Sequence, residues 1–357
     1  MLGIRFSIIP IVFILFFFIN SIGCKAGNDT AERLPVDTRI EAPGVEPLDA
    51  AIGLFANGPD GYVLAAQGAT LIRLRDGGRA IEPLYRFDDP IAGIHATTSG
   101  IILVSTDRDH WDPATPCRVF VSLDRARSFK LSKEIKGGCA LWWSFASGQD
   151  GTLYMGEYGP SKDVWSKTVW RSRDRGQSWH AVFHAPLNDR AHVHRVAVDP
   201  YTGDVWVTVG DTKKNRSTFR SMDGGDTWQK VRVSQATAVA FTADGIYWGE
   251  DVSEGEISLT HRLDGNTATV LKVSNLGKYG GSVYDLALGR SGRVYAPFMK
   301  YPKQDHIATV WSGVGAEWKL LLRVASRPGE GVGLETIAGP DRDGWLYVPG
   351  FRIRDGS

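Results

Sequence analysis

Short apolar runs separated by turns recur along the chain from about residue 50 onward. Each repeat pairs an apolar strand, a Gly-bearing turn and a second strand that ends in small residues. The chain has 41 Gly and 12 Trp and no long stretch of helical apolar periodicity, which predicts an all-β protein of short strands. Seven repeats are present: Phe55 to Ala66, Ile94 to Ser105, Phe145 to Gly156, Val196 to Thr208, Val239 to Gly249, Leu286 to Pro297 and Ile337 to Pro349.

An eight-residue motif, S-x-D-x-G-x-[ST]-[WF], lies later in three of these repeats. Two copies are clean, Ser172 to Trp179 and Ser221 to Trp228, and a weaker one is Ser122 to Phe129. Successive copies are 50 and 49 residues apart, which is in the range of a four-stranded propeller blade. Because each copy lies between two strand-like runs, it is predicted to form the hairpin between the third and fourth strands of a blade.

This motif resembles the Asp-box of sialidase-like (BNR-repeat) β-propellers. In that family the Asp and the Ser or Thr tie a tight turn, the aromatic ring packs between blades, and the box usually lies opposite the ligand site. The resemblance implies a β-propeller, and the seven repeats predict seven four-stranded blades, with six blades plus a hairpin as the alternative. The residues given this structural role are Ser122, Asp124, Ser172, Asp174, Gly176, Trp179, Ser221, Asp223, Gly225 and Trp228.

The last repeat leaves only Phe351 to Arg354 for a third strand before the chain ends at Ser357. A blade that lacks its outer strand exposes a sheet edge, and propellers commonly close by taking a strand from the other terminus. Residues Asp37 to Glu41 are predicted to supply that strand. The predicted organisation is therefore a signal peptide (1–23), a lipid-anchored tether (24–36) and a single propeller (37–357).

The N-terminus has the pattern of an export signal. Arg5 precedes an apolar run from Ile8 to Ile19, which at 12 residues is shorter than the roughly 20 that a spanning helix needs. Ser21 to Cys24 resembles a bacterial lipobox, which implies lipidation of Cys24 and an exported envelope lipoprotein, periplasmic or surface-facing. Cleavage near Ala26 without a lipid is the alternative.

The two remaining cysteines predict a disulfide, and the charge balance restricts the classes of partner. Cys117 and Cys139 form an even pair in an exported chain, which predicts a disulfide between neighbouring strands of one blade or at its edge; two buried thiols are the alternative. The chain holds 41 basic and 40 acidic residues, so it has no general attraction for nucleic acid or an anionic membrane. We expect a monomer without an organic cofactor; a divalent cation stays open.

Chemistry-bearing residues gather where a blade's first strand begins and its second strand ends, and in propellers these positions share one face of the central channel. The predicted catalytic set is Glu157, Asp211, Glu250 and His194, because carboxylates beside a histidine can transfer protons or hold a divalent ion. The predicted ligand-binding set is His192, Arg195, Tyr158, Trp142, Trp143, Asp107 and Asp251. First strands also begin near His95, Tyr284 and Asp285. Each carboxylate has the alternative of capping backbone amides.

Two details of this set suggest a ligand. His192 and His194 are two residues apart, so on a strand they face the same side and form a candidate metal pair; hydrogen bonds to backbone carbonyls are the alternative. The flat rings of Trp142 and Trp143 suit stacking against sugars, although packing between blades also uses tryptophan.

Three functions follow from the sequence. The favoured one is an exported propeller that binds a glycan at its channel mouth, with cleavage as a glycoside hydrolase or polysaccharide lyase left open. The others are a non-catalytic module that docks an envelope protein or polymer, and a metal-dependent lyase or hydrolase. Exo-sialidase activity is disfavoured, because Arg39-Ile40-Glu41-Ala42-Pro43 lacks the family's adjacent Arg-Ile-Pro.

Overall fold

The computed structural model describes residues 37–49, 51–109, 112, 114–159, 168–185, 192–210, 215–252, 256–261, 281–300, 306–326 and 334–357. The chain divides into two units, Met1–Arg33 and Leu34–Ser357, and every described residue belongs to the second. The predicted signal peptide, the tether and Cys24 lie outside the described residues. Within the described ranges, no helix has the length and apolar character needed to cross a membrane.

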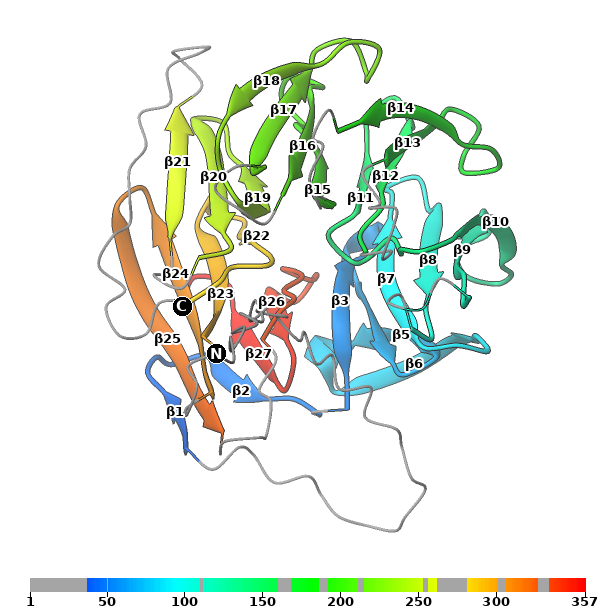
Figure 1. Cartoon of the computed structure of the whole chain (residues 1–357). Helices are drawn as coiled ribbons and strands as arrows, with labels where there is room; N and C mark the ends of the chain where they lie inside the picture. The colour runs from blue at the N-terminus through cyan, green and yellow to red at the C-terminus, as the bar shows by residue number, and fades with distance from the viewer. Residues whose placement is uncertain are drawn as a thin grey trace, which may run out of the picture. The chain divides into compact units, whose positions relative to one another are not determined.

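Seven antiparallel sheets of the second unit form a ring, so the predicted seven-bladed β-propeller is confirmed (Figure 1). Blades 1 and 2 comprise β3 (Gly53–Asn57), β4 (Val63–Gln67), β5 (Thr70–Arg75) and β6 (Ala80–Arg86), then β7 (Ile91–Ala96), β8 (Ile102–Thr106), β9 (Cys117–Ser122) and β10 (Lys130–Ile135). Blades 3 and 4 comprise β11 (Phe145–Ser147), β12 (Leu153–Gly156), β13 (Thr168–Ser172) and β14 (His180–His184), then β15 (Val193–Val198), β16 (Val205–Val209), β17 (Ser217–Ser221) and β18 (Gln229–Arg232).

The last three blades are less uniform in the described part of the chain. Blade 5 shows β19 (Ala236–Phe241), β20 (Gly245–Glu250) and β21 (Ile257–His261). Blade 6 runs from β22 (Ala287–Leu288) through β23 (Val294–Lys300), β24 (His306–Val314) and β25 (Glu317–Ser326) to β1 (Asp37–Ile40). Blade 7 holds β26 (Trp345–Val348), β27 (Phe351–Arg354) and β2 (Val45–Pro47), and Ala338 bridges Tyr347 on its inner side. Two 3-10 turns, Pro59–Gly61 and Asp76–Gly78, lie in blade 1.

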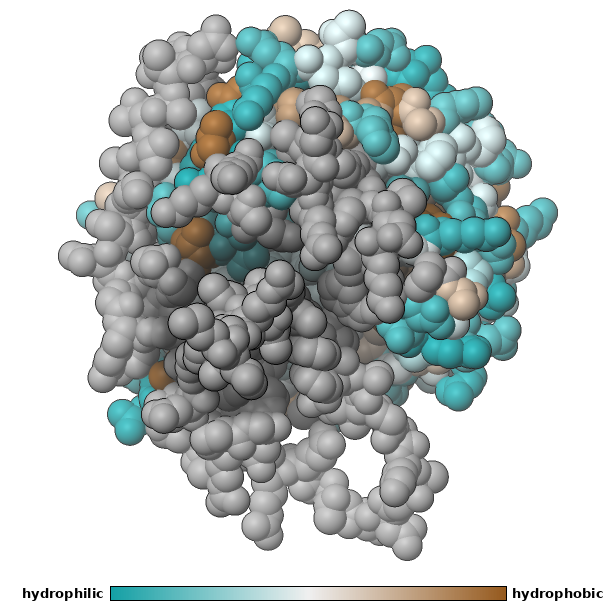
Figure 2. All heavy atoms as spheres, viewed as in Figure 1, coloured by the Kyte–Doolittle hydropathy of each residue, from teal (hydrophilic) through white to brown (hydrophobic). Residues whose placement is uncertain are grey.

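Burial explains why the second strands lack the polar alternation of a half-exposed sheet. Strands β8 and β16 are buried over their whole length, because a blade's middle is covered on both faces by its neighbours. The fourth strands β10 and β18 lie at the rim and are largely exposed and polar. Figure 2 shows a mainly hydrophilic surface over the described part of the rim in this view, with scattered apolar residues.

An N-terminal strand closes the ring, as predicted, but it is a different strand from the one expected. Strand β2 pairs with β27 through Val45 and Ile353, whereas Asp37–Ile40 pairs with β25 as a fifth strand of blade 6. The side chains explain this choice, because Val45 is 6% exposed in the core and Ile40 is 47% exposed at an edge. Gly44, at φ +83, makes the reversal between them.

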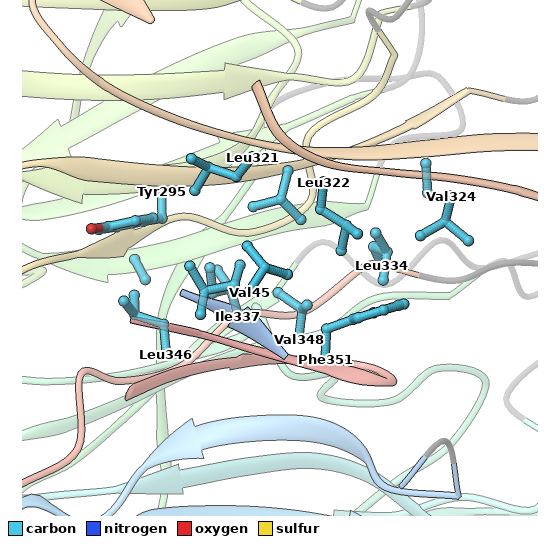
Figure 3. Close-up of a cluster of buried hydrophobic side chains, with 14 of the residues drawn as sticks. Val45, Tyr295, Leu321, Leu322, Val324, Leu334, Ile337, Leu346, Val348 and Phe351 are labelled. Atoms are coloured by element: carbon cyan, nitrogen blue, oxygen red, sulfur yellow. The ribbon is translucent and has the colours of Figure 1, made fainter. Parts of the chain in front are cut away.

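The core at the closure draws side chains from both ends of the chain. Figure 3 shows Val45 beside Leu346, Val348 and Phe351 of blade 7, with Leu322 of blade 6 facing them. All these residues are buried. The closing strand is therefore held by side-chain burial as well as by its backbone hydrogen bonds.

The three Asp-boxes form the hairpins between third and fourth strands, at β9–β10, β13–β14 and β17–β18, as predicted. In the middle copy, Asp174 Oδ1 accepts the Ser178 backbone N–H at 2.9 Å and Asp174 Oδ2 accepts the Ser178 hydroxyl at 2.5 Å. The Ser172 hydroxyl binds Asp174 Oδ1 at 2.8 Å and accepts the Gly176 N–H at 2.8 Å. Asp124 and Asp223 repeat this network with Ser122, Ser128, Ser221 and Thr227.

The aromatic ring of each clean box connects neighbouring blades. Trp179 donates its indole N–H to Ser132 of blade 2 at 2.7 Å, and Trp228 donates to the Val182 carbonyl of blade 3 at 2.9 Å. Gly176 also packs against the preceding blade, since a Cβ there would lie 3.2 Å from Val121. The boxes therefore belong to the packing between blades.

The disulfide between Cys117 and Cys139 is present and joins two blades. Cys117 lies on β9 of blade 2, and Cys139 pairs with Tyr158 just before the first strand of blade 3. The expectation of a link within one blade or at its edge is therefore replaced by a link across the seam between two blades.

The closure predicts unequal roles for two N-terminal apolar residues. Val45→Ala should lower the free energy of unfolding by about 2 kcal/mol, because it empties part of a packed core. Ile40→Ala, at an exposed edge, should change it by less than about 0.5 kcal/mol. Urea unfolding of both variants measures this, and equal losses would contradict the assignment of the closing strand.

The Asp-boxes predict a component of acid sensitivity. Hydrogen bonds from the Ser128 and Ser178 side chains and backbone hold the pKa of Asp124 and Asp174 at about 2, below the value of about 3.9 in an unfolded chain. A depressed pKa stabilises the fold above about pH 4 and loses that stabilisation as the pH falls toward 2. A variant with Asp124→Asn and Asp174→Asn should show a smaller fall in unfolding free energy over this window than the wild type; identical pH profiles would contradict the prediction.

Candidate functional site

The first strands lie nearest the axis of the ring (Figure 1). Antiparallel pairing places the turn between a blade's first and second strands on the same face as its Asp-box hairpin. The segment before the first strand and the loop after the second therefore lie on the opposite face, where the candidate residues were expected.

A tight turn before β11 presents two tryptophans on that face. Leu141 accepts the Ser144 backbone N–H at 2.9 Å and donates its own to the Ser144 hydroxyl at 3.1 Å, which places Trp142 and Trp143 at the centre of the turn. Their ring centroids are 4.3 Å apart. The disulfide at Cys139 anchors the start of this segment.

The turn packs against rings from three other positions, and we call this group the histidine–aromatic cluster: Trp142, Trp143, Tyr158, His192, His194 and Tyr284. Trp143 meets Tyr158 edge-on at 5.1 Å and stacks with Tyr284 at 5.8 Å. Tyr158 lies 4.1 Å from His192. Because these residues come from blades 3, 4 and 6, only closure of the ring brings them together.

The two histidines of the cluster bind each other. Their Nε2 atoms are 2.8 Å apart, so one imidazole donates and the other accepts. A metal ion that used both Nε2 atoms would have to displace this hydrogen bond. Among the described residues no group of three or more His, Cys, Asp and Glu side chains is arranged to hold a metal. The geometry therefore favours the hydrogen-bonded pair, and Nε2 chelation by His192 and His194 stays a prediction.

Arg195 reaches from blade 4 to Asp285 of blade 6, with 3.2 Å between Nη1 and Oδ1. Asp285 also accepts the backbone N–H groups of Leu286 and Ile337, and thereby connects three blades. Burial raises the pKa of Asp285, and the Arg195 charge opposes that rise. Burial and the same positive charge lower the pKa of His95 to about 4, so His95 is a neutral imidazole above that pH.

Asp251 joins the cluster through Tyr284, whose hydroxyl donates to Asp251 Oδ1 at 3.2 Å. Gln235 donates to the other carboxylate oxygen at 3.4 Å. Tyr284 and Asp285 were recognisable in the sequence by position alone, because they directly precede a first strand. Their contacts with Asp251, Trp143 and Arg195 required the folded ring.

The structure places Glu157 at the seam between blades 2 and 3. It accepts the Trp170 indole N–H at 2.7 Å, and the ammonium of Lys133, on β10, lies 3.4 Å from the Trp170 ring. Burial raises the Glu157 pKa, while the Trp170 hydrogen bond and the Lys133 charge oppose that rise.

Glu250 occupies the corresponding place between blades 4 and 5. It is 4% exposed and pairs at 2.8 Å with Arg232 of β18, which also binds Ser258 at 2.7 Å. Burial raises the pKa of Glu250 as well. In both seams, a Glu at the end of a second strand interacts with a base on the preceding blade's outer strand.

The glycines before these two Glu residues explain the shared arrangement. A Cβ on Gly156 or Gly249 would lie 2.5 Å from Val193 or Val283 of the next blade. Only glycine lets the strand end pass so close to that valine.

The catalytic roles of Glu157, Glu250 and His194 stay predictions. Asp211 lies outside the described residues, and Asp107 follows β8 with its backbone N–H bound to Pro90 at 2.9 Å.

Comparisons with known proteins identify the fold. No protein-family model and no curated protein sequence matches the chain. Among solved structures, a chain of the mitotic checkpoint complex has a TM-score of 0.58 at 12% identity, covering 93% of this chain and 98% of that one. The GH74 enzyme of Niastella koreensis has a TM-score of 0.55 at 13% identity, covering 76% of this chain and 47% of the enzyme.

A third similar structure is the extracellular domain of BT4673 from B. thetaiotaomicron. Its TM-score is 0.58 at 10% identity, over 90% of this chain and 40% of that one. The chain thus spans less than half the length of the GH74 and BT4673 structures. At these identities the similarity shows a shared propeller fold.

The seam at Glu250 predicts a pH-dependent defect. Arg232→Met should lower the free energy of unfolding by about 3 kcal/mol at pH 7, because it leaves a buried carboxylate without its cation. The loss should shrink as the pH falls toward 5, since the raised pKa of Glu250 lets it take up a proton in the folded state before the unfolded chain does.

Lys230→Met is the matched control, because Lys230 is exposed on the same strand. It should change the unfolding free energy by less than about 0.5 kcal/mol. Urea unfolding at pH 7 and pH 5 measures both variants. A loss in Arg232→Met that does not depend on pH would show that the Glu250 charge is not its cause.

Proposed function

We propose that this protein is an exported carbohydrate-binding β-propeller whose ligand contacts the histidine–aromatic cluster. One observation carries the proposal: rings from three blades converge beside a histidine pair on the face away from the Asp-boxes. Sugars present apolar C–H faces that pack on such rings and hydroxyl edges that bond to imidazole nitrogens and carboxylates.

The positions of the carboxylates support binding over cleavage. A glycoside hydrolase needs two carboxyl groups that flank one bond, about 5 to 5.5 Å or 6.5 to 9.5 Å apart. Glu157 and Glu250 lie at two different seams, and each interacts with a base of the preceding blade. Asp251 and Asp285, which lie beside the cluster, already accept hydrogen bonds from Tyr284 and Arg195.

The comparisons add context to this proposal. The GH74 enzyme and the BT4673 extracellular domain share the propeller fold, which fits a carbohydrate-related, extracytoplasmic role. The export-signal pattern and the resemblance of Ser21 to Cys24 to a lipobox support export and attachment to the envelope by a lipid. Under this proposal the glycan is the partner, and the lipid keeps the propeller close to the cell surface.

The test is a glycan-binding screen of the protein, followed by titration calorimetry with the best ligand. Trp142→Ala should weaken binding about tenfold, because it removes a half-buried ring from the cluster. Tyr201→Ala is the control: this ring is 53% exposed in the turn between a first and a second strand, on the opposite face.

Unchanged affinity in Trp142→Ala, or no glycan bound by the wild type, would contradict the proposal. A reducing-end assay on the same glycans measures cleavage. Turnover that is lost in Glu157→Gln, with the fold intact, would instead support the catalytic prediction for that residue.

A further inference from the structure

Several buried nitrogen atoms beside the channel face lack a hydrogen-bond partner within the described part of the chain. They are Trp142 Nε1, Trp143 Nε1, Arg195 Nε and His95 Nε2. A buried N–H without an acceptor destabilises a fold, and native proteins carry few of them. Four unpaired nitrogen atoms in one region of the protein therefore need a physical explanation.

These nitrogens belong to one neighbourhood. The Val196 N–H, next to Arg195, donates to the Trp143 carbonyl at 3.4 Å. The Arg195 charge acts on His95, and a Cβ on Gly93, two residues before His95, would lie 2.8 Å from the Leu141 backbone next to Trp142. The four side chains thus come from blades 2, 3 and 4 around the same part of the axis.

Most of the other tryptophans that the structure describes have acceptors for their indole N–H. Trp170, Trp179, Trp228, Trp248, Trp311 and Trp318 donate to protein oxygens at 2.7 to 3.1 Å. Trp206 is an exception outside the cluster, where the Arg220 guanidinium lies 5.4 Å from its ring. Trp142 and Trp143 are adjacent, and they lie where the proposed ligand binds.

The charges of the described residues in this region disfavour a strongly anionic ligand group. Arg195 is already paired with Asp285, and His95 is neutral above pH 4. A carboxylate or sulfate on the ligand would approach the carboxylates of Asp285 and Asp251, and the charge of the neighbouring Arg195 is already offset by its pairing with Asp285. Uncharged oxygens accept hydrogen bonds from the N–H groups without that repulsion.

We propose that Trp142, Trp143, Arg195 and His95 bind hydroxyl or amide carbonyl oxygens of an uncharged sugar, so that the ligand class is neutral glycans. This inference rests on the proposed carbohydrate-binding function and specifies it further. The aromatic rings hold the apolar face of the sugar, and the nitrogens select its oxygen atoms. Removing one N–H while keeping a ring in place separates these two contributions.

The test uses the full-length protein with Trp143→Phe and Trp142→Phe, compared on an array of neutral, uronate-containing and sulfated glycans and by calorimetry. Neutral glycans should bind, and each variant should weaken that binding about tenfold. Without glycan, each variant should have a Tm equal to or above the wild type, because it loses an unpaired buried donor.

Trp228→Phe is the matched control, because its indole N–H is bonded to the Val182 and Gly225 carbonyls. It should lower the Tm and leave glycan affinity unchanged. If only acidic glycans bind, or if both Trp variants bind neutral glycans as the wild type does, the inference is overturned while the carbohydrate-binding function stands. If no glycan binds, the function itself fails.

Discussion

The pairing of β2 with β27 is the interaction on which the rest of the propeller depends. It joins the first described part of the chain to the last, and Val45 completes a core with residues of blades 6 and 7. An open ring would leave blade 7 with an unpaired edge and would separate blades that now touch. Asp285 shows the consequence for the site, because it binds Arg195 of blade 4 and the backbone of blade 7 together.

Several polar interactions and one disulfide fix neighbouring blades against each other at the seams. The Asp-box tryptophans donate hydrogen bonds to the preceding blade, and the disulfide joins blades 2 and 3. Glu250 of blade 5 pairs with Arg232 of blade 4. These contacts differ chemically, yet each fixes one blade against its neighbour. Because the rings of the histidine–aromatic cluster come from different blades, these contacts between blades also fix the positions of the rings relative to one another.

The candidate site shows how well the position of a residue within a blade repeat predicts its position in the folded propeller. Blade repeats grouped His192, His194, Trp142 and Trp143 because strand order determines which loops share a face, and in the structure His192 contacts His194 and Trp142 contacts Trp143. The same reasoning grouped Glu157 and Glu250 with them. Glu157 instead accepts the Trp170 indole N–H, and Glu250 pairs with Arg232 of an outer strand. A repeat pattern does not say which way a residue at a strand end will point.

The blade count, the strand order and the Asp-box hairpins follow from the sequence, because these depend on local turn chemistry and on apolar runs that recur at a similar spacing. Tertiary structure decided which N-terminal strand closes the ring, which seam holds the disulfide, and which side chains meet at the channel. Each of those contacts joins residues from different blades. Val45 is buried and Ile40 is exposed because the core formed by blades 6 and 7 accommodates the strand that carries Val45. The local sequence pattern does not specify which of the two strands closes the ring.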